Sequence, residues 1–186
     1  MNAPAAPAAP PPFQIHRISV GFAAIEDRLR LDAADAAGNA RAFWLTRRIV
    51  LRWGEAMAHW LTNSNPLANK LPSALVGEAL SMEHAAAQAR AQATAEPSAR
   101  VVAQTPPALV LGLQIKPQPG GCVIDIESAG APPARLTLDR PSSHRTLGLL
   151  ARFVKQAEWW PDKGPPWVEA LEISGAPSGQ SPERLN

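Results

Sequence analysis

Glu83 and His84 are the pair of residues in this sequence that most resembles an acid–base site. They are adjacent in an alanine-rich segment that predicts a helix. Adjacent residues of a helix point about 100° apart, so we expect that the two side chains do not act on one atom from a single face. The zinc-protease pattern, with a second histidine four residues away on one helix, is absent. These features favour a structural or capping role for the pair.

Other residues whose side chains could take part in catalysis or metal binding are scattered along the chain. Glu55 and His59 are four residues apart, a spacing typical of a solvated contact on a helix. Ser143 and His144 fall in the first turn of a predicted helix, where a serine more often caps the helix than attacks a substrate. Cys122 is the single cysteine, so an internal disulfide and a thiolate metal cluster are excluded. We therefore predict no catalytic residues, no metal and no cofactor.

A small enzyme or metal protein is the rival hypothesis. It would use His59, Glu83, His84 or His144, and it requires that at least two of them converge in one pocket. A phosphate-binding loop does not contribute to it, because "PGG" at 119–121 indicates a hairpin turn with no helix after it.

Tryptophan and arginine side chains gather in residues 40–61, "ARAFWLTRRIVLRWGEAMAHWL". Arginines can bind phosphates and tryptophans can stack on bases, so the stretch could be a nucleic-acid surface. Trp53 and Trp60, however, lie on the apolar side of a predicted helix, as core residues do. Trp44 is predicted to lie on the sheet face opposite Phe43 and Leu45, which makes it the better stacking candidate.

The function that we predict is a non-enzymatic binding or assembly module. Its partner would be a single-stranded nucleic acid or, as an alternative, an acidic protein surface. The predicted contact surface combines basic side chains from both halves of the chain with one tryptophan: Arg28, Arg30, Arg41, Trp44, Arg47, Arg48, Arg135, Arg140 and Arg145.

Composition permits an anionic partner without requiring one. The chain has 186 residues and a net charge of +2, which is a mild basic bias. The N-terminal "MNAPAAPAAPPP" lacks the basic and apolar regions of a secretory signal, and no segment reaches the roughly 20 apolar residues of a membrane span. We expect a soluble, cytoplasmic protein that is a monomer or a homodimer.

Hydrophobic periodicity predicts the elements that position these residues. The first half offers strands over 13–22, 26–33 and 41–45 and a helix that Thr46 caps. A loop over 62–72, a helix over 73–94 and a linker over 95–107 follow. The second half offers strands over 108–116, 122–128 and 134–138 and a helix, capped by Ser142 or Ser143, that ends near 158.

The repeated order of strand, strand, strand and helix indicates an internal duplication. We predict an α+β fold in which two such units, 13–62 and 108–158, are related by a pseudo-two-fold axis and bridged by the alanine-rich helix. Together they would form a single domain over 13–158. An Ala/Pro-rich tail over 1–12 would precede it, and a Trp/Pro-rich tail over 159–186 would follow.

Three strings, "EDRLRLDAADAAGNARAFWLTRR", "EALSMEHAAA" and "PPALVLGLQI", carry a resemblance to a group of small uncharacterised proteobacterial proteins. The shared features are a DRL-L…WLTRR opening and a central EH helix, across most of residues 24–158, and they imply no activity. The duplicated architecture also resembles the PUR and Whirly families, which implies binding of single-stranded nucleic acid. The repeats of those families have four strands, whereas three are predicted here.

Overall fold

The computed structural model describes residues 11–66, 70, 72–93 and 100–159. The chain divides into two compact units, each assembled from separate parts of the sequence. The described residues within 1–49 and 100–137 form the first, here called the sheet unit, and those within 50–99 and 138–186 form the second, the helix unit. The predicted tail over 1–12 lies almost wholly outside the described residues.

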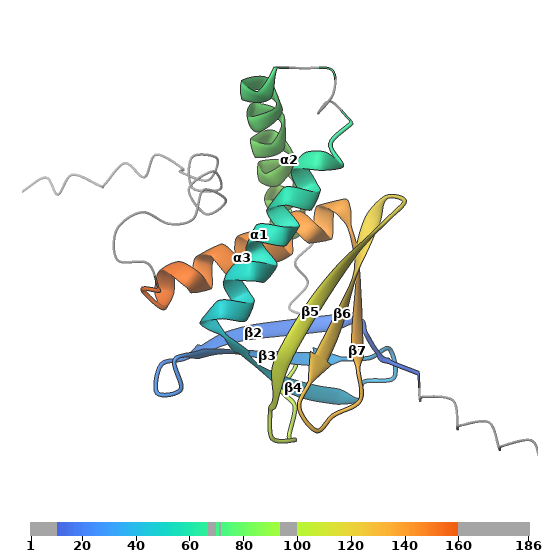
Figure 1. Cartoon of the computed structure of the whole chain (residues 1–186), viewed down its shortest axis with the longest axis vertical. Coiled ribbons are helices and arrows are strands. Elements are labelled where there is room, and N and C mark those ends of the chain that lie inside the picture. The colour runs from blue at the N-terminus through green and yellow to red at the C-terminus, as the bar shows by residue number, and fades with distance from the viewer. Residues whose placement is uncertain (1–10, 67–69, 71, 94–99, 160–186) are drawn as a thin grey trace, which may run out of the picture. The chain divides into compact units, whose positions relative to one another are not determined.

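The sheet unit contains a mixed sheet of order β1-β7-β6-β5-β4-β3-β2. Two antiparallel meanders, β2-β3-β4 and β5-β6-β7, meet where β4 and β5 pair in parallel at Phe43 with Ala108 and at Trp44 with Leu109. In Figure 1, the strands of the second meander rise steeply across those of the first. The strands are β1 (Phe13–Ile15), β2 (Arg17–Ala23), β3 (Arg28–Ala34), β4 (Ala40–Thr46), β5 (Ala108–Gln118), β6 (Gly121–Ser128) and β7 (Ala134–Asp139).

The two ends of this strand order meet at His16. β1 pairs in parallel with β7, whereas β2 pairs with β3 at the other end of the order. His16 alone separates β1 from β2, so the sheet curls until its ends are adjacent. The single strand predicted over 13–22 is therefore two strands with different partners, which is a correction to the sequence prediction.

The α+β class is confirmed, with a helix after each meander. The predicted two-fold relation is not confirmed, because a two-fold axis normal to the sheet would make the strands that meet at its centre antiparallel copies of one another. Instead β4 lies parallel to β5, and strands β2 to β7 follow in chain order across the sheet. The second meander is thus displaced along the sheet from the first. The predicted single domain over 13–158 remains a prediction.

The described part of the chain contains three helices, which lie in the helix unit apart from the first turn of α1: α1 (Arg47–Asn63), α2 (Ser73–Ala93) and α3 (Arg140–Gln156). In α1, Val50, Trp53 and Met57 are buried as predicted, Ile49 and Leu61 are buried as well, and Trp60, which was predicted to be buried, is half-buried. In α3 the buried side chains include Leu147, Leu150 and Val154. None of the described helices is long and apolar enough to cross a bilayer.

The N-termini of α1 and α3 both have identifiable capping residues. Thr46 Oγ1 accepts a hydrogen bond of 3.4 Å from the Ile49 N–H, as predicted for the first helix. The cap of α3 is Asp139, whose carboxylate accepts from the Ser142 N–H at 2.7 Å. The prediction of Ser142 or Ser143 was wrong, because Ser143 Oγ donates back to the Asp139 carbonyl from inside the helix.

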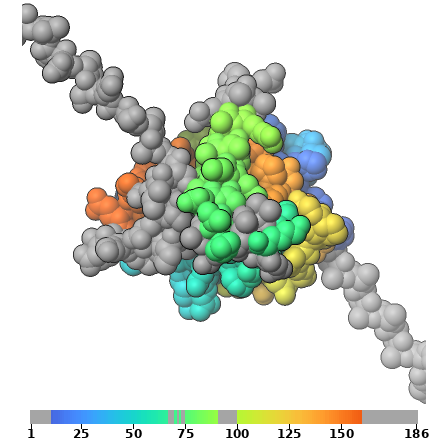
Figure 2. All heavy atoms as spheres, turned by 90° about the horizontal axis from the view of Figure 1, so that it is seen from above, coloured from blue at the N-terminus to red at the C-terminus, as the bar shows by residue number. Residues whose placement is uncertain are grey.

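The alanine-rich α2 has no apolar stripe of the usual width. Among its described side chains only Val76, His84 and Ala87 are buried, and Met82 is exposed. Figure 2, in which α2 is green, shows the helix at the surface of that view. Of the tryptophans predicted for the C-terminal tail, Trp159 is buried, and Trp160 and Trp167 lie outside the described residues.

Candidate functional site

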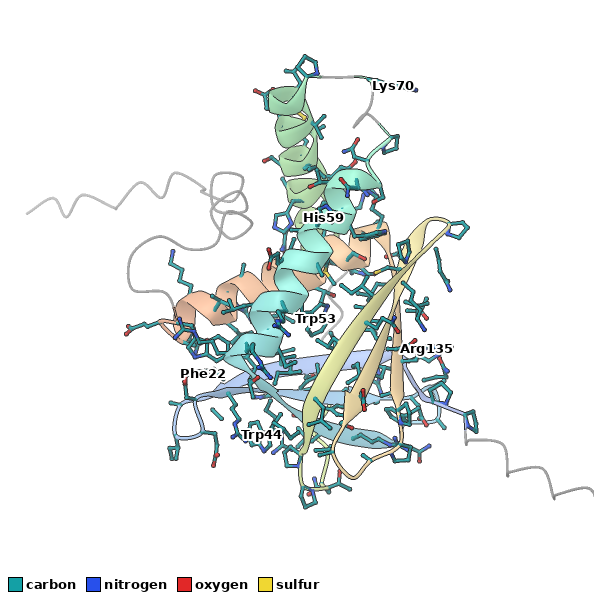
Figure 3. All side chains as sticks on the ribbon, viewed as in Figure 1. Phe22, Trp44, Trp53, His59, Lys70 and Arg135 are labelled. Carbon is teal, nitrogen blue, oxygen red and sulfur yellow. The ribbon has the colours of Figure 1, made fainter. Side chains whose placement is uncertain are left out.

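Strand register sorts the residues of β3 and β4 onto two faces. Leu29 pairs with Leu45 and Leu31 with Phe43, and all four are fully buried. Arg30 pairs with Trp44 and Arg28 with Thr46 on the opposite side, which we call the outer face. Trp44, labelled beside these strands in Figure 3, is half-buried. The predicted orientation of Trp44 is confirmed.

Arg30 on the outer face is held by an internal ion pair. Its Nε lies 3.1 Å from both carboxylate oxygens of Asp32, and its Nη2 lies 2.9 Å from Asp32 Oδ1. The same Nη2 donates to the Ala103 carbonyl at 2.8 Å. These bonds fix the guanidinium in the row of residues that contains Trp44. The ion pair with Asp32 also neutralises part of its positive charge.

Residues 100–103 cross the outer face as a strap. Ala103 N–H donates to the Asp32 carboxylate and Val101 N–H donates to Ser19 Oγ, both at 3.0 Å. Arg100 lies against Gly21, where an added Cβ would stand 3.1 Å from its Nη2. The described part of the linker predicted over 95–107 is therefore docked on the sheet.

Arg100 is a basic residue of the outer face that sequence reasoning missed. Its side chain is exposed, and Gly21, beside which it lies, pairs with Arg30. Periodicity carries no information about a segment that crosses strands. The available signal was Gly21 itself, because a glycine inside a strand often marks close approach by another backbone or side chain.

Two further arginines follow β4 directly. Arg47 and Arg48 begin α1 and are exposed, and the first turn of this helix contains no acidic residue. Their charges lie at the positive end of the helix dipole, so a nearby anion would stabilise this end of the helix. Arg28 joins them through its pairing with Thr46. Arg28, Arg30, Trp44, Arg47, Arg48 and Arg100 are together called the basic face.

The remaining predicted contact residues lie elsewhere. Arg41 shares the buried side of β4, with its guanidinium 4.4 Å from the Phe13 ring centroid. Arg135 binds Asp125 at 2.6 Å, and this bond and that of Lys116 lower the pKa of Asp125 to about 2. In the helix unit, Arg145 donates to Ser142 Oγ. Arg41 and Arg135 belong to the sheet unit but not to its basic face, Arg145 belongs to the helix unit, and the binding roles of all three stay predictions.

Arg140 belongs to a polar network in the helix unit. Its Nε and Nη2 donate to Glu83 Oε2 at 2.9 and 2.7 Å, so the carboxylate of α2 is bound to the start of α3. The guanidinium also donates to the Leu61 carbonyl and to Ser64 Oγ at the end of α1 and just beyond. Four bonds thus use most of the donors of this side chain.

Three of the four residues of the enzyme hypothesis meet at this network. His144 Nε2 lies 3.0 Å from Glu83 Oε2, and the ring centroids of His84 and His144 are 5.8 Å apart. Glu83 and His84 both contact α3, Glu83 through a hydrogen bond to His144 and His84 through ring contact with it, and the expectation that they do not act on one atom from a single face stays a prediction. His59, labelled on α1 in Figure 3, instead contacts Asn63.

Burial determines the chemistry that this network can perform. It lowers the pKa of His84 to about 4 and also lowers the pKa of His144, despite the opposing effect of Glu83. The Nδ1 atoms of both rings are buried and have no hydrogen-bond partner among the described residues. The histidines are thus neutral at pH 7, and the hydrogen bond that joins α2 to α3 here is the one between His144 Nε2 and Glu83.

A cavity of about 270 Å³ adjoins the network, lined by Glu83, Ala86, Ala87, Arg90, Arg140, Pro141 and His144. Glu83 and His144 both line it, so the convergence of two residues that the enzyme hypothesis requires is present, and that hypothesis stays open. Among the described lining residues Glu83 is the only acidic one, and it is already bound to Arg140 and His144. Across the described part of the chain, no three His, Cys, Asp or Glu side chains are placed to bind one metal ion.

Comparison with known proteins found no family model, no curated protein and no solved structure that matches this chain. The resemblances drawn from sequence therefore stay predictions.

Proposed function

We propose that the protein is a non-enzymatic binding module that contacts single-stranded nucleic acid through the basic face. The observation that supports this proposal most directly is the register of β3 and β4, which aligns Arg28 and Arg30 with Thr46 and Trp44 on one side of the sheet. The opposite side is filled by fully buried leucine and phenylalanine side chains.

The basic face combines the two contacts that such a ligand requires. A half-exposed indole offers a surface on which one base can stack, a contact worth about 1–3 kcal/mol. Arg28, Arg48 and Arg100 make no interaction with another described side chain that would neutralise them, so their charges are available to phosphates. Arg30, held by Asp32, contributes a fixed side chain beside Trp44 and little net charge.

A charge reversal on the basic face, Arg28→Glu combined with Arg48→Glu, tests the proposal. We expect the affinity for a labelled oligothymidylate to fall at least tenfold at low salt, because two phosphate contacts become repulsive. Fluorescence anisotropy with the full chain measures this affinity, and circular dichroism verifies the fold of each variant.

A matched control applies the same change in net charge to the helix unit. Lys70 and Arg152 are exposed there, and Lys70→Glu with Arg152→Glu should weaken binding less than threefold. Equal losses in the two double variants would assign binding to overall charge and would contradict the proposal for the basic face.

An acidic protein surface is the second candidate partner. Two exposed apolar side chains favour it, Val102 of the strap at 55% and Leu111 of β5 at 54% exposure. Leu111 follows shortly after Leu109, the residue that pairs with Trp44. Apolar side chains beside arginines are typical of a protein interface, whereas a nucleic-acid backbone gains little from them.

A further inference from the structure

The helix unit buries two histidines against each other where α2 meets α3. His84 is 6% exposed and His144 is 3% exposed, and their rings are inclined at 56°. Buried histidines that are not metal ligands ordinarily bond through both ring nitrogens. Here one nitrogen of each ring has no partner among the described residues, so the neutral forms already carry a cost and charged forms would carry a larger one.

Gly148 makes this close approach possible. A Cβ added at this position of α3 would stand 2.8 Å from His84 Cε1 and would also clash with Gln88 Nε2. The imidazole of His84 therefore lies directly on the backbone of α3.

The charges that face the two rings come from both helices. Among the described residues, Glu83 of α2 is the only carboxylate in contact with the pair, and it already accepts two bonds from Arg140 and one from His144. Arg140 is permanently charged, and Arg90 lines the neighbouring cavity. The neutral neighbour Gln88 lies 3.5 Å from His84 Nε2. A second positive charge at His84 would thus find no anion.

We propose that the His84–His144 contact is an acid-sensitive junction, at which protonation of His84 releases α2 from α3. Protonation would place an uncompensated cation beside His144 and Arg140 in a buried environment. This proposal concerns the helix unit and does not depend on what the basic face binds.

The direction of the pH effect follows from the histidine pKa. Burial lowers the pKa of His84 from 6.5 to about 4, so the opened state takes up a proton more readily than the closed state. The stability of the closed junction is therefore complete above pH 6.5 and declines as the pH falls from there toward 4. At pH 5 the difference in proton binding at His84 alone favours opening by about 30-fold.

Hydrogen–deuterium exchange of α2 peptides in the full chain tests the proposal. After correction for intrinsic exchange rates, we expect protection of α2 to be about 30-fold lower at pH 5.0 than at pH 7.5. His84→Gln should remove most of this difference, whereas the exposed His59→Gln should retain it. A difference of less than threefold in the wild-type chain, or an equal difference in His84→Gln, would overturn the proposal.

A second measurement uses only the wild-type chain, so it tests the proposal even if His84→Gln fails to fold. An NMR titration of the imidazole resonances in the wild-type chain should place the midpoint of His84 well below 6.5. A midpoint at or above 6.5 would mean that the folded state accepts the proton freely, and the junction would not be acid-sensitive.

Discussion

Replacing Asp32 by alanine should lower the free energy of unfolding by about 3 kcal/mol. Asp32 is 3% exposed, and its carboxylate accepts bonds from the Arg30 guanidinium and from the Ala103 N–H. Its removal leaves a partly buried guanidinium without its anion and a buried backbone donor without its acceptor. Urea denaturation followed by tryptophan fluorescence measures the loss.

Glu127→Ala is the matched control for this variant. Glu127 lies on β6 in the same sheet but is exposed, so its replacement should cost less than 0.5 kcal/mol by the usual magnitude for surface sites. Exchange at Val101 and Ala103 should also rise in Asp32→Ala, because the strap loses one of its three described backbone hydrogen bonds and Arg30, which makes another, loses its ion pair. Unchanged exchange there would show that Asp32 does not hold the strap.

Glu83→Ala should cost about 2.5 kcal/mol of unfolding free energy, somewhat less than the roughly 3–5 kcal/mol for breaking a fully buried ion pair, because both partners retain some exposure. Glu83 is the shared acceptor for Arg140 and His144, which come from another helix. Without it, Arg140 retains its bonds to Leu61 and Ser64 but loses its counter-charge.

Glu78→Ala in the same helix isolates this effect from helix propensity. Glu78 is exposed on α2, so both variants gain the same intrinsic preference for alanine and only Glu83→Ala loses an ion pair. Denaturation at pH 7.5 compares them. Similar stabilities for the two variants would contradict the assignment of Glu83 as the residue that joins α2 to α3.

Local patterns in the sequence predicted the elements closely. The second meander was located to within a few residues, because glycines mark its turns: Gly120 and Gly130 both adopt positive φ, at 75° and 68°. Alternation along β3 and β4 also placed Arg28, Arg30 and Trp44 on the face opposite the buried leucines. These features depend on residues near one another in the chain, where period and turn type are informative.

Features that join distant residues were missed. Glu83 and His144 are 61 residues apart, and the separation of Asp32 from Ala103 is 71 residues. Periodicity describes one element at a time and does not state which elements meet or in which order strands pair. For this reason the division of 13–22 between two partners, the strap and the histidine pair could be recognised only in the structure.

The measurement that tests the proposed function most directly is the salt dependence of wild-type binding to a labelled oligothymidylate. Neutralisation of phosphates by Arg28, Arg48 and Arg100 predicts that log K falls against log salt concentration with a slope of about −2. No anisotropy change at low salt, or binding that is insensitive to salt, would contradict recognition of a nucleic-acid backbone and would leave an acidic protein as the partner to pursue.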